Sequence, residues 1–297
     1  MLDFQPIKIE DKNKIESFLK QLQSRLCAHC FVDLYIWRCE YDTQVCIKDG
    51  FLFIKQRVEG ENIYTVPLGK GSMKNALEDL RQDAGERGTD FSFHAVNEEI
   101  KSRLEQQLPD KFIFTEKRDA EDYIYSGESL MTLQGKKLHS KRNFINRFKN
   151  EYEGRWSYEK ISPKNIHEVF DYHLSWCAMN QQGKKDEFWG ETCAVSIALK
   201  NFSELELKGG LIRVDDKVLA FTIGSMPLED MFIVHIEKAD YTIPGLYQMI
   251  NNQFALEYFE GIAFINREED MGKDGLRKAK LSYQPVKMGL NYSAVLK

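Results

Sequence analysis

Residues 231–266 read "MFIVHIEKADYTIPGLYQMINNQFALEYFEGIAFIN" and combine two strand-like runs with a helical pattern between them. The first run, "MFIVHIEKA", and the last, "IAFIN", are rich in the β-branched and aromatic residues that favour strands. Pro244 suits the first turn of a helix. Apolar residues then recur at the four-residue spacing of one helix face: Leu246, Ile250, Phe254 and Tyr258. The stretch predicts a strand, a helix and a strand of an α/β domain.

Outward from this stretch, the order of elements is the same in both halves of the chain. Each half shows a helix, three consecutive strands, a helix, a strand, a further helix and closing strands. In the first half, the pair Asp49-Gly50 marks a turn between strands and Ser72 suits the N-cap of a helix. The sequence therefore predicts an α/β fold with mixed sheets, built as two domains at residues 1–135 and 155–297, with a linker helix at residues 136–154.

Composition excludes several classes of protein. The 297 residues are 42% hydrophobic and 29% charged with a net charge of −5, which is typical of a globular domain and gives no overall attraction to nucleic acid. We expect a cytoplasmic protein without a transmembrane segment, because no apolar run approaches about 20 residues and the N-terminus lacks a signal-peptide core. The motifs GxSxG, Walker A, HExxH and GxGxxG are missing from the sequence, which argues against common hydrolases, NTPases and dehydrogenases. The sequence does not indicate an oligomeric state.

The segment "GKKLHSKRNFINRFKN" at residues 135–150 is strongly basic and contains no acidic residue. On a helix, Lys141, Arg142 and Lys149 form a basic face, while Phe144 and Phe148 are expected to pack inward. Two interpretations stay open: a solvated linker helix, or a patch that binds the phosphates of tRNA or coenzyme A.

Two groups of residues raise the question of a metal, and we expect none. Cys27 and Cys30 form a lone CxxC without the second pair of ligands that structural zinc needs, so buried thiols are the better interpretation. Glu268, Glu269 and Asp270 follow a strand, but their spacing lacks a calcium-loop pattern. These acids would instead attract a cationic acceptor.

Several stretches together resemble the C-terminal catalytic domain of phosphatidylglycerol lysyltransferases. They occur in the family's order along nearly the whole chain: "FVDLYIWR", "YTVPLG", "DAEDYIYSGESLMTLQGKKLHSKRNFINRF", "VHIEKAD", "IPGLYQMIN" and "INREEDMGKDGLRKAKLSYQP". The resemblance implies two tandem GNAT-like acyltransferase domains, related to the Fem-type aminoacyltransferases.

In the resembled fold, the fourth strand and the next helix splay from the fifth strand and form a wedge for the acyl donor. Here the wedge would lie between "MFIVHIEKA" and "IAFIN", with the helix after Pro244 as its floor. A helix N-terminus suits a pyrophosphate. The donor-binding residues expected on this basis are Ala239, Tyr241, Pro244, Gly245, Leu246, Lys280, Lys141 and Arg142.

The resemblance also implies the chemistry. Asn266, at the end of the fifth strand, would steady the donor, and Tyr283 would protonate the leaving group. Glu237 or His235, on the splayed strand, would act as the base for the attacking group. We therefore expect an acyl- or aminoacyltransferase that uses coenzyme A or aminoacyl-tRNA as donor, an amine or hydroxyl as acceptor and no metal. The alternative is a GNAT-like module that binds coenzyme A or RNA phosphates without turnover.

Overall fold

The computed structural model describes residues 2–89, 91–180 and 189–297. Within these ranges, no helix combines the length and the apolar character needed to cross a membrane.

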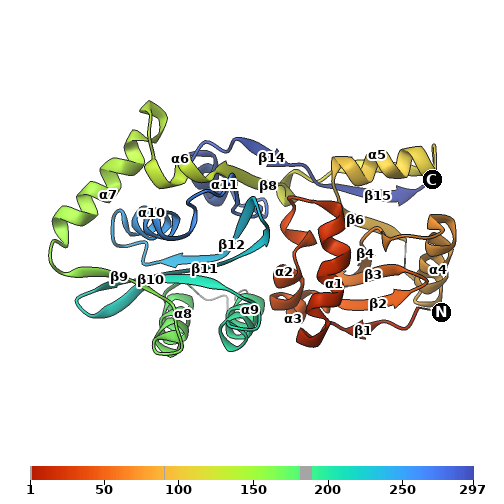
Figure 1. Cartoon of the computed structure of the whole chain (residues 1–297), viewed down its shortest axis with the longest axis horizontal. Helices are drawn as coiled ribbons and strands as arrows, with labels where there is room; N and C mark the ends of the chain where they lie inside the picture. The colour runs from red at the N-terminus through yellow and green to blue at the C-terminus, as the bar shows by residue number, and fades with distance from the viewer. Residues whose placement is uncertain (1, 90, 181–188) are drawn as a thin grey trace. The chain divides into compact units, whose positions relative to one another are not determined.

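The chain forms two compact units, each a mixed sheet covered by helices (Figure 1). Unit 1 comprises residues 1–122 together with 289–297, and unit 2 comprises residues 123–288. The fold class expected from the repeated order of elements is confirmed.

The sheet of unit 1 has the strand order β1-β2-β3-β4-β6-β15-β7, with β5 paired to β3. Its strands are β1 (Gln5–Pro6), β2 (Gln44–Lys48), β3 (Phe51–Val58), β4 (Glu61–Tyr64), β5 (Leu68–Gly69), β6 (Ser92–Val96), β7 (Phe112–Glu116) and β15 (Tyr292–Leu296). Strands β4 and β6 are parallel and meet at the pair Tyr64 and Phe93, whereas β15 is antiparallel to both β6 and β7.

The helices of unit 1 are α1 (Lys12–Leu19), α2 (Phe31–Ile36), α3 (Arg38–Tyr41), α4 (Met73–Glu86) and α5 (Glu98–Gln107), with short 3-10 turns η1 (Ile9–Asp11), η2 (Lys20–Leu22), η3 (Cys27–His29) and η4 (Arg118–Ala120). Two of these helices, α4 and α5, begin at a capping side chain. Ser72 caps α4 as predicted, and Asn97 caps α5 by accepting the Ile100 N–H at 2.8 Å. The left-handed conformation of Gln23 ends the first helical region early, and α2 was not predicted.

The sheet of unit 2 has the order β14-β8-β13-β12-β11-β10-β9. Its strands are β8 (Asp122–Ser126), β9 (Trp156–Lys160), β10 (Lys208–Val214), β11 (Lys217–Leu228), β12 (Met231–Ala239), β13 (Phe264–Asn266) and β14 (Lys287–Gly289). Strands β12 and β13 are parallel, and their pairing runs from Met231 with Phe264 to Ile233 with Asn266. Beyond Ile233, β12 continues without a ladder partner on β13.

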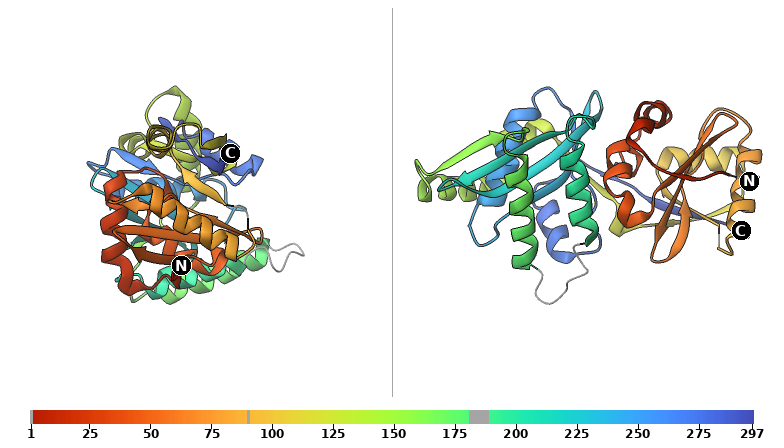
Figure 2. Two further views of the ribbon diagram at one scale, coloured as in Figure 1. Left: turned by 90° about the vertical axis from the view of Figure 1, so that its right-hand side faces the viewer. Right: turned by 90° about the horizontal axis from the view of Figure 1, so that it is seen from below.

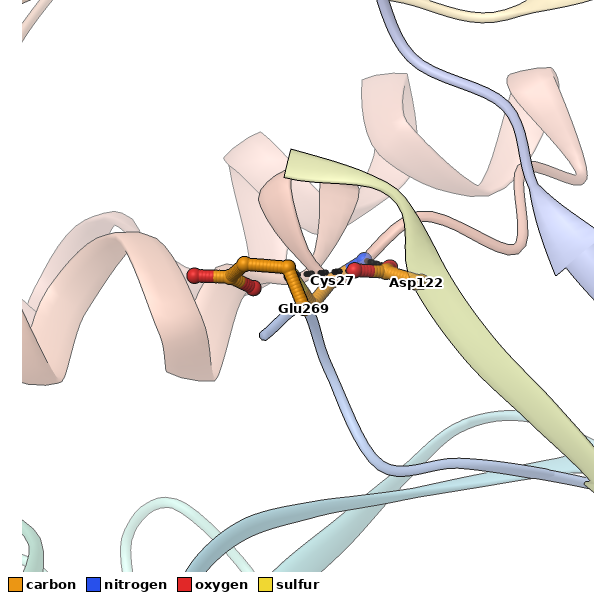
Figure 3. Close-up of side chains that lie close together, drawn as sticks. All are labelled: Cys27, Asp122 and Glu269. Carbon is orange, nitrogen blue, oxygen red and sulfur yellow. Dashed lines mark hydrogen bonds between the residues drawn. The ribbon is translucent and has the colours of Figure 1, made fainter. Parts of the chain in front are cut away.

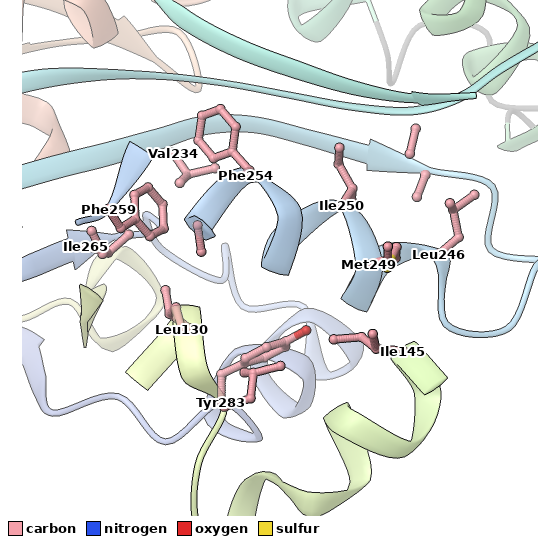
Figure 4. Packing of buried hydrophobic residues seen from close by; sticks show 14 of the residues in the cluster. Leu130, Ile145, Val234, Leu246, Met249, Ile250, Phe254, Phe259, Ile265 and Tyr283 are labelled. Carbon is pink, nitrogen blue, oxygen red and sulfur yellow. The ribbon is translucent and has the colours of Figure 1, made fainter. Parts of the chain in front are cut away.

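Helices cover both faces of the unit 2 sheet. They are α6 (Gly127–Thr132), α7 (His139–Glu151), α8 (Ile166–Asn180), α9 (Trp189–Lys200), α10 (Leu246–Tyr258) and α11 (Asp274–Leu281), with the short turn η5 (Lys136–Leu138). Figures 1 and 2 show α8 and α9 side by side on one face, and α10 on the other. Figure 4 shows Phe254 and Phe259 in the core beside α10. Their ring centroids lie 5.7 and 5.3 Å, respectively, from that of Phe232.

Helix α7 belongs to unit 2 and is not a separate linker. Its buried face carries Lys141, Ile145 and Phe148, which share one side at i, i+4 and i+7 spacing. Phe148 is buried as expected, but the expectation for Phe144 was wrong, since that side chain is 42% exposed. Lys141, expected on a basic face that is either solvated or binds phosphates, is buried.

Each of the two sheets contains one strand that comes from the other half of the chain. Strand β8 was expected to close the first half, but it lies between β14 and β13 of unit 2. The terminal strand β15 was expected in the second half, but it lies between β6 and β7 of unit 1. The unit boundaries therefore fall at residues 122 and 289 rather than at the expected junction, because a strand's own residues do not specify its distant partner.

Two neighbouring residues of β15 test this exchange. Ala294 is fully buried, whereas Val295 is 44% exposed on the other face of the strand. We expect Ala294→Lys to lower the free energy of unfolding by about 3–5 kcal/mol, because the charge would be buried without a partner. Val295→Lys is the matched control and should change it by about 0.5 kcal/mol or less. Urea unfolding measures both variants. Equal losses of unfolding free energy in Ala294→Lys and Val295→Lys would contradict the position of β15 between β6 and β7.

Candidate functional site

Strand β12 contains a bulge where it leaves β13. Ile223 of β11 faces Ile236, but the next residue, Gly224, faces Val234, so His235 is an extra residue in β12. In a regular strand, residues 234 and 237 would point to opposite faces. Here Val234 packs in the core beneath α10, and Glu237 also bonds to α10. The bulge thus directs Glu237 toward the helix.

Glu237 is held by two side chains from other elements. Its Oε1 accepts a hydrogen bond from Arg267 Nη2 at 2.8 Å, and its Oε2 accepts one from Asn251 Nδ2 at 3.0 Å. Arg267 directly follows β13, and Asn251 lies on α10. Both side chains of the ion pair are only 12% exposed. A nearly buried ion pair therefore occupies the place where the two parallel strands diverge.

Two polar atoms of the cluster formed by Glu237, Arg267 and Asn251 make no hydrogen bond within the described part of the chain. Among the described residues, Arg267 Nη1 and Asn251 Oδ1 are buried and have no hydrogen-bond partner. Buried polar atoms in proteins are rarely left in this state. One donor and one acceptor are therefore available to a bound molecule beside Glu237.

Tyr283 lies in the same neighbourhood, between two cations. The Arg267 guanidinium carbon is 4.9 Å from the Tyr283 ring centroid, and Lys141 Nζ is 4.3 Å from it. The ring packs beneath α10 in the core that also contains Leu130 and Ile145 (Figure 4). Burial raises the pKa of Tyr283 well above its ordinary value near 10, so the phenol stays protonated at neutral pH. Burial, assisted by the charge of Arg267, lowers the pKa of Lys141.

His235 belongs to a separate hydrogen-bonded series. Its Nδ1 lies 2.9 Å from Glu268 Oε1, and its Nε2 lies 2.8 Å from Ser225 Oγ. The side chain of His235 is completely buried. The order serine, imidazole, carboxylate fixes the orientation of the ring.

Asn266 and Lys280 shape the loop after β13. Asn266 Oδ1 accepts the backbone N–H of Glu268 at 2.6 Å. Lys280 Nζ donates to the carbonyl oxygens of Arg267, Glu268 and Glu269, which matches the three N–H groups of an ammonium. These two residues hold the backbone that carries Arg267.

Of the acidic run in this loop, Asp270 is buried, whereas Glu268 and Glu269 are partly exposed. Asp270 is completely buried and accepts hydrogen bonds from the Tyr123 hydroxyl at 2.6 Å, the Gly272 N–H at 2.9 Å and the Arg277 guanidinium at 2.8 Å. The bonds from Arg277, together with those from Tyr123 and Gly272, hold the pKa of Asp270 well below its ordinary value, against the effect of burial. Asp270 therefore secures the loop to the rest of unit 2.

The expected donor-binding residues near α10 are mostly packing residues. Gly245 has φ 91°, and a Cβ at this position would lie 2.2 Å from the carbonyl oxygen of Phe144 in α7. Ala239 and Leu246 are fully buried, and Tyr241 is exposed. The remaining members of the expected set are Pro244, which precedes Gly245, and Arg142, whose Nη1 donates to the carbonyl oxygens of Leu133 and Gly135.

The thiols of the CxxC segment are buried in unit 1. The backbone N–H of Cys27 donates to Asp122 Oδ2 at 2.6 Å, and its Sγ lies 3.4 Å from Asp122 Oδ1 (Figure 3). Cys30 is also buried. Cys27 thus helps to tie η3 to Asp122, the first residue of β8.

The comparisons agree with this architecture. The family described as "Phosphatidylglycerol lysyltransferase, C-terminal" matches residues 19–295. The chain belongs to this family. A similar solved structure is a conserved protein of unknown function from Bacteroides thetaiotaomicron, at 42% identity over the full length of both chains with a TM-score of 0.92.

Two more distant relatives complete the comparison. L-PGS from Bacillus licheniformis is 16% identical over 96% of this chain and 91% of its own, with a TM-score of 0.64, which shows a shared fold. An uncharacterized protein of Mycoplasmoides gallisepticum is 25% identical over 164 residues, which cover 55% of this chain and about half, 52%, of that relative.

In this member of the lysyltransferase C-terminal family, the structure brings Glu237, Tyr283 and Lys141 together and places Asn266, His235 and Lys280 in supporting networks. Sequence reasoning missed Arg267 and Asn251. The available signal was the pair Asn251-Asn252, two amides within the buried face of an otherwise apolar helix. Buried polar side chains of this kind require partners.

Asp270 gives the loop a pH dependence that can be measured. The pKa of Asp270 is lower in the native state than in the unfolded chain, where it is about 3.9. The ionised Asp270 carboxylate therefore stabilises the native state fully above about pH 4, and this stabilisation is lost as the pH falls below that value. The difference in unfolding free energy between the wild type and Asp270→Asn should therefore be largest above about pH 4 and should shrink at lower pH. Urea unfolding between pH 3 and pH 7 measures it. The exposed Glu260→Gln is the control, and a pH-independent difference for Asp270→Asn would refute this role.

Proposed function

We propose that this chain is an aminoacyltransferase, which moves an aminoacyl group from a charged tRNA to an amine or hydroxyl at the divergence of β12 and β13. The observation that carries the proposal is the buried cluster of Glu237, Arg267 and Asn251, with one donor and one acceptor unused among the described residues. Family membership supports the same class of reaction.

Acyl transfer needs a base, a stabilised oxyanion and an acid, and the cluster offers a group for each. Glu237 is the proposed base, because a carboxylate has about four acceptor positions and, within the part of the chain that the structure describes, two are occupied, by Arg267 and Asn251. The unused Nη1 of Arg267 is the proposed oxyanion donor. Tyr283, which remains protonated, is the proposed acid for the leaving group.

The start of α10 favours tRNA over coenzyme A as the donor. A pyrophosphate at a helix N-terminus needs close access to the backbone. A Cβ at Gly245 would lie 2.2 Å from the carbonyl oxygen of Phe144, so α7 packs closely against the backbone just before α10, and the negative partial charge of this oxygen disfavours a phosphate beside it. We therefore take coenzyme A as the second donor to be tested.

Replacement of Glu237 tests the proposal. Purified protein would be incubated with radiolabelled lysyl-tRNA or acetyl-coenzyme A, together with phosphatidylglycerol micelles or a pool of small amines. Glu237→Gln preserves the shape but removes the base, and should reduce label transfer by about 10²–10⁴-fold. The exposed Glu229→Gln is the matched control. Equal transfer by wild type and Glu237→Gln would overturn the role of Glu237, and binding without transfer would favour the non-catalytic module.

The role of Tyr283 is tested separately. Tyr283→Phe keeps the ring between Arg267 and Lys141 and removes only the hydroxyl. We expect turnover to fall by about 10²–10⁴-fold while donor affinity is retained. Tyr258→Phe, which removes a hydroxyl that donates to the Gly209 carbonyl at 3.2 Å, controls for loss of a buried hydrogen bond. If Tyr283→Phe lowers the free energy of unfolding but leaves turnover unchanged, the Tyr283 hydroxyl has a structural role and is not the acid of the reaction.

A further inference from the structure

One end of a buried amide in α10 has no hydrogen-bond partner. Asn251 is 2% exposed, and its Nδ2 donates to Glu237 Oε2 at 3.0 Å. Its Oδ1 is buried and accepts no hydrogen bond from the described part of the chain. Asn165, another buried asparagine of unit 2, uses both ends, since Oδ1 accepts the Ser162 N–H at 2.9 Å and Nδ2 donates to the Lys160 carbonyl at 3.1 Å. Burial of a polar atom without a partner is unfavourable, so the Oδ1 of Asn251 requires a donor from outside the chain.

The orientation of the Asn251 amide is fixed by its neighbour. A carboxylate held by a guanidinium accepts hydrogen bonds and donates none, so the Asn251 atom that faces Glu237 is the amide nitrogen. Turning the amide over would bring two acceptors together. The Oδ1 therefore remains an available acceptor beside the bond to Glu237.

An unused donor lies next to the other oxygen of the same carboxylate. Arg267 Nη2 donates to Glu237 Oε1 at 2.8 Å, while Nη1 of the same guanidinium is buried without a partner among the described residues. The guanidinium carbon lies 4.9 Å from the ring centroid of Tyr283 and 5.7 Å from that of Tyr125. Nη1 shares its carbon with Nη2, and Oδ1 of Asn251 shares its carbon with Nδ2. One donor and one acceptor thus belong to the two groups that hold Glu237.

This pair of groups is complementary to an α-amino ester. The carbonyl oxygen of such an ester accepts hydrogen bonds, and its α-amino group donates them, whereas an acetyl or fatty acyl group offers the carbonyl oxygen alone. An amino group also fits better than a hydroxyl, because Asn251 Oδ1 and Glu237 Oε2 are neighbouring acceptors. An amino group has at least two N–H donors where a hydroxyl has one O–H. The neutral amide oxygen accepts from the amine in either of its protonation states.

We infer that Asn251 determines which donors the site selects: its Oδ1 accepts a hydrogen bond from the α-amino group, while Arg267 Nη1 binds the carbonyl oxygen of the same aminoacyl group. This inference rests on the function proposed for the Glu237 cluster and adds the chemical class of its donor. The site takes α-aminoacyl esters and rejects acyl groups without the α-amine. Such a group would enclose Oδ1 without a hydrogen bond, which disfavours its binding and its transfer.

The test compares two donors that differ in one group. One is lysyl-tRNA, and the other is the same tRNA charged with 6-aminohexanoic acid, which is lysine without its α-amino group. Both are labelled in the acyl group and supplied to the full chain with phosphatidylglycerol micelles or the pool of small amines. The α-amine also alters the reactivity of the ester, but this contribution is the same for every variant. The readout is therefore how far a variant changes the ratio of the two kcat/KM values.

Asn251→Ala should lower the preference for the lysyl group by about 10–10²-fold, the effect of one buried acceptor left unpaired. Asn252→Ala is the matched control, because Asn252 is the next residue of α10, is also buried, and donates to the carbonyl oxygens of Leu130 and Met131 at 3.1 and 2.8 Å. Both variants remove a buried amide of one helix, so a general loss of stability affects both. An unchanged preference in Asn251→Ala, or an equal fall in both variants, would overturn the role of Asn251.

A binding measurement separates this inference from the proposed function. Amides of 3′-amino-3′-deoxyadenosine with lysine and with 6-aminohexanoic acid imitate the ends of the two donors but do not release their acyl groups. In calorimetric titration, the wild type should bind the lysyl amide about 10–10²-fold more tightly than the other. Since this comparison needs no variant, it also decides the question if Asn251→Ala does not fold.

The two measurements together distinguish the possible failures. If the wild type transfers neither acyl group but keeps the difference in affinity, the proposed reaction is wrong and recognition of the α-amine stands. If the wild type transfers both groups but binds the two amides equally, the transferase proposal stands and the recognition is wrong. Absence of binding of either amide also refutes the recognition.

Discussion

The short parallel pairing between β12 and β13 is the constraint on which the rest of unit 2 depends. It extends only from Met231 with Phe264 to Ile233 with Asn266, and β12 then continues for six more residues without β13 beside it. Unpaired backbone inside a domain needs other partners. Helix α10 packs apolar side chains against β12, and its Asn251 donates a hydrogen bond to Glu237. The Glu237–Arg267 ion pair connects β12 to the residue that follows β13.

A bulge in one strand decides the electrostatic balance of the buried cluster in unit 2. The extra residue in β12 turns Glu237 toward Arg267, so the buried cation is matched within the chain. Without His235, Glu237 would point to the opposite face of the sheet and Arg267 would lose its carboxylate partner. Removing one charge from a buried pair is costly.

The sequence predicted those features that short stretches encode by themselves. Periodicity identified the strands and α10, and Ser72 marked the start of α4. Helix α9 was missed because it is apolar on most sides and lacks a clear stripe. The partners of β8 and β15, the burial of Lys141 and the pairing of Arg267 were also missed. All four depend on contacts between residues distant in sequence, which local periodicity does not report.

The exchange of β8 and β15 also sets an order of completion during synthesis. Residues 1–122 are made before unit 2, yet the strand that fills the space between β6 and β7 is formed by residues 292–296, which follow unit 2 in the chain. At about 5–20 residues per second, the ribosome needs on the order of ten to thirty seconds to make the intervening unit 2. During that interval β6 and β7 each present an open edge, which invites pairing with other chains. Unit 1 is therefore completed after the strands of unit 2 have been made, because β6 and β7 gain their shared neighbour only with residues 292–296.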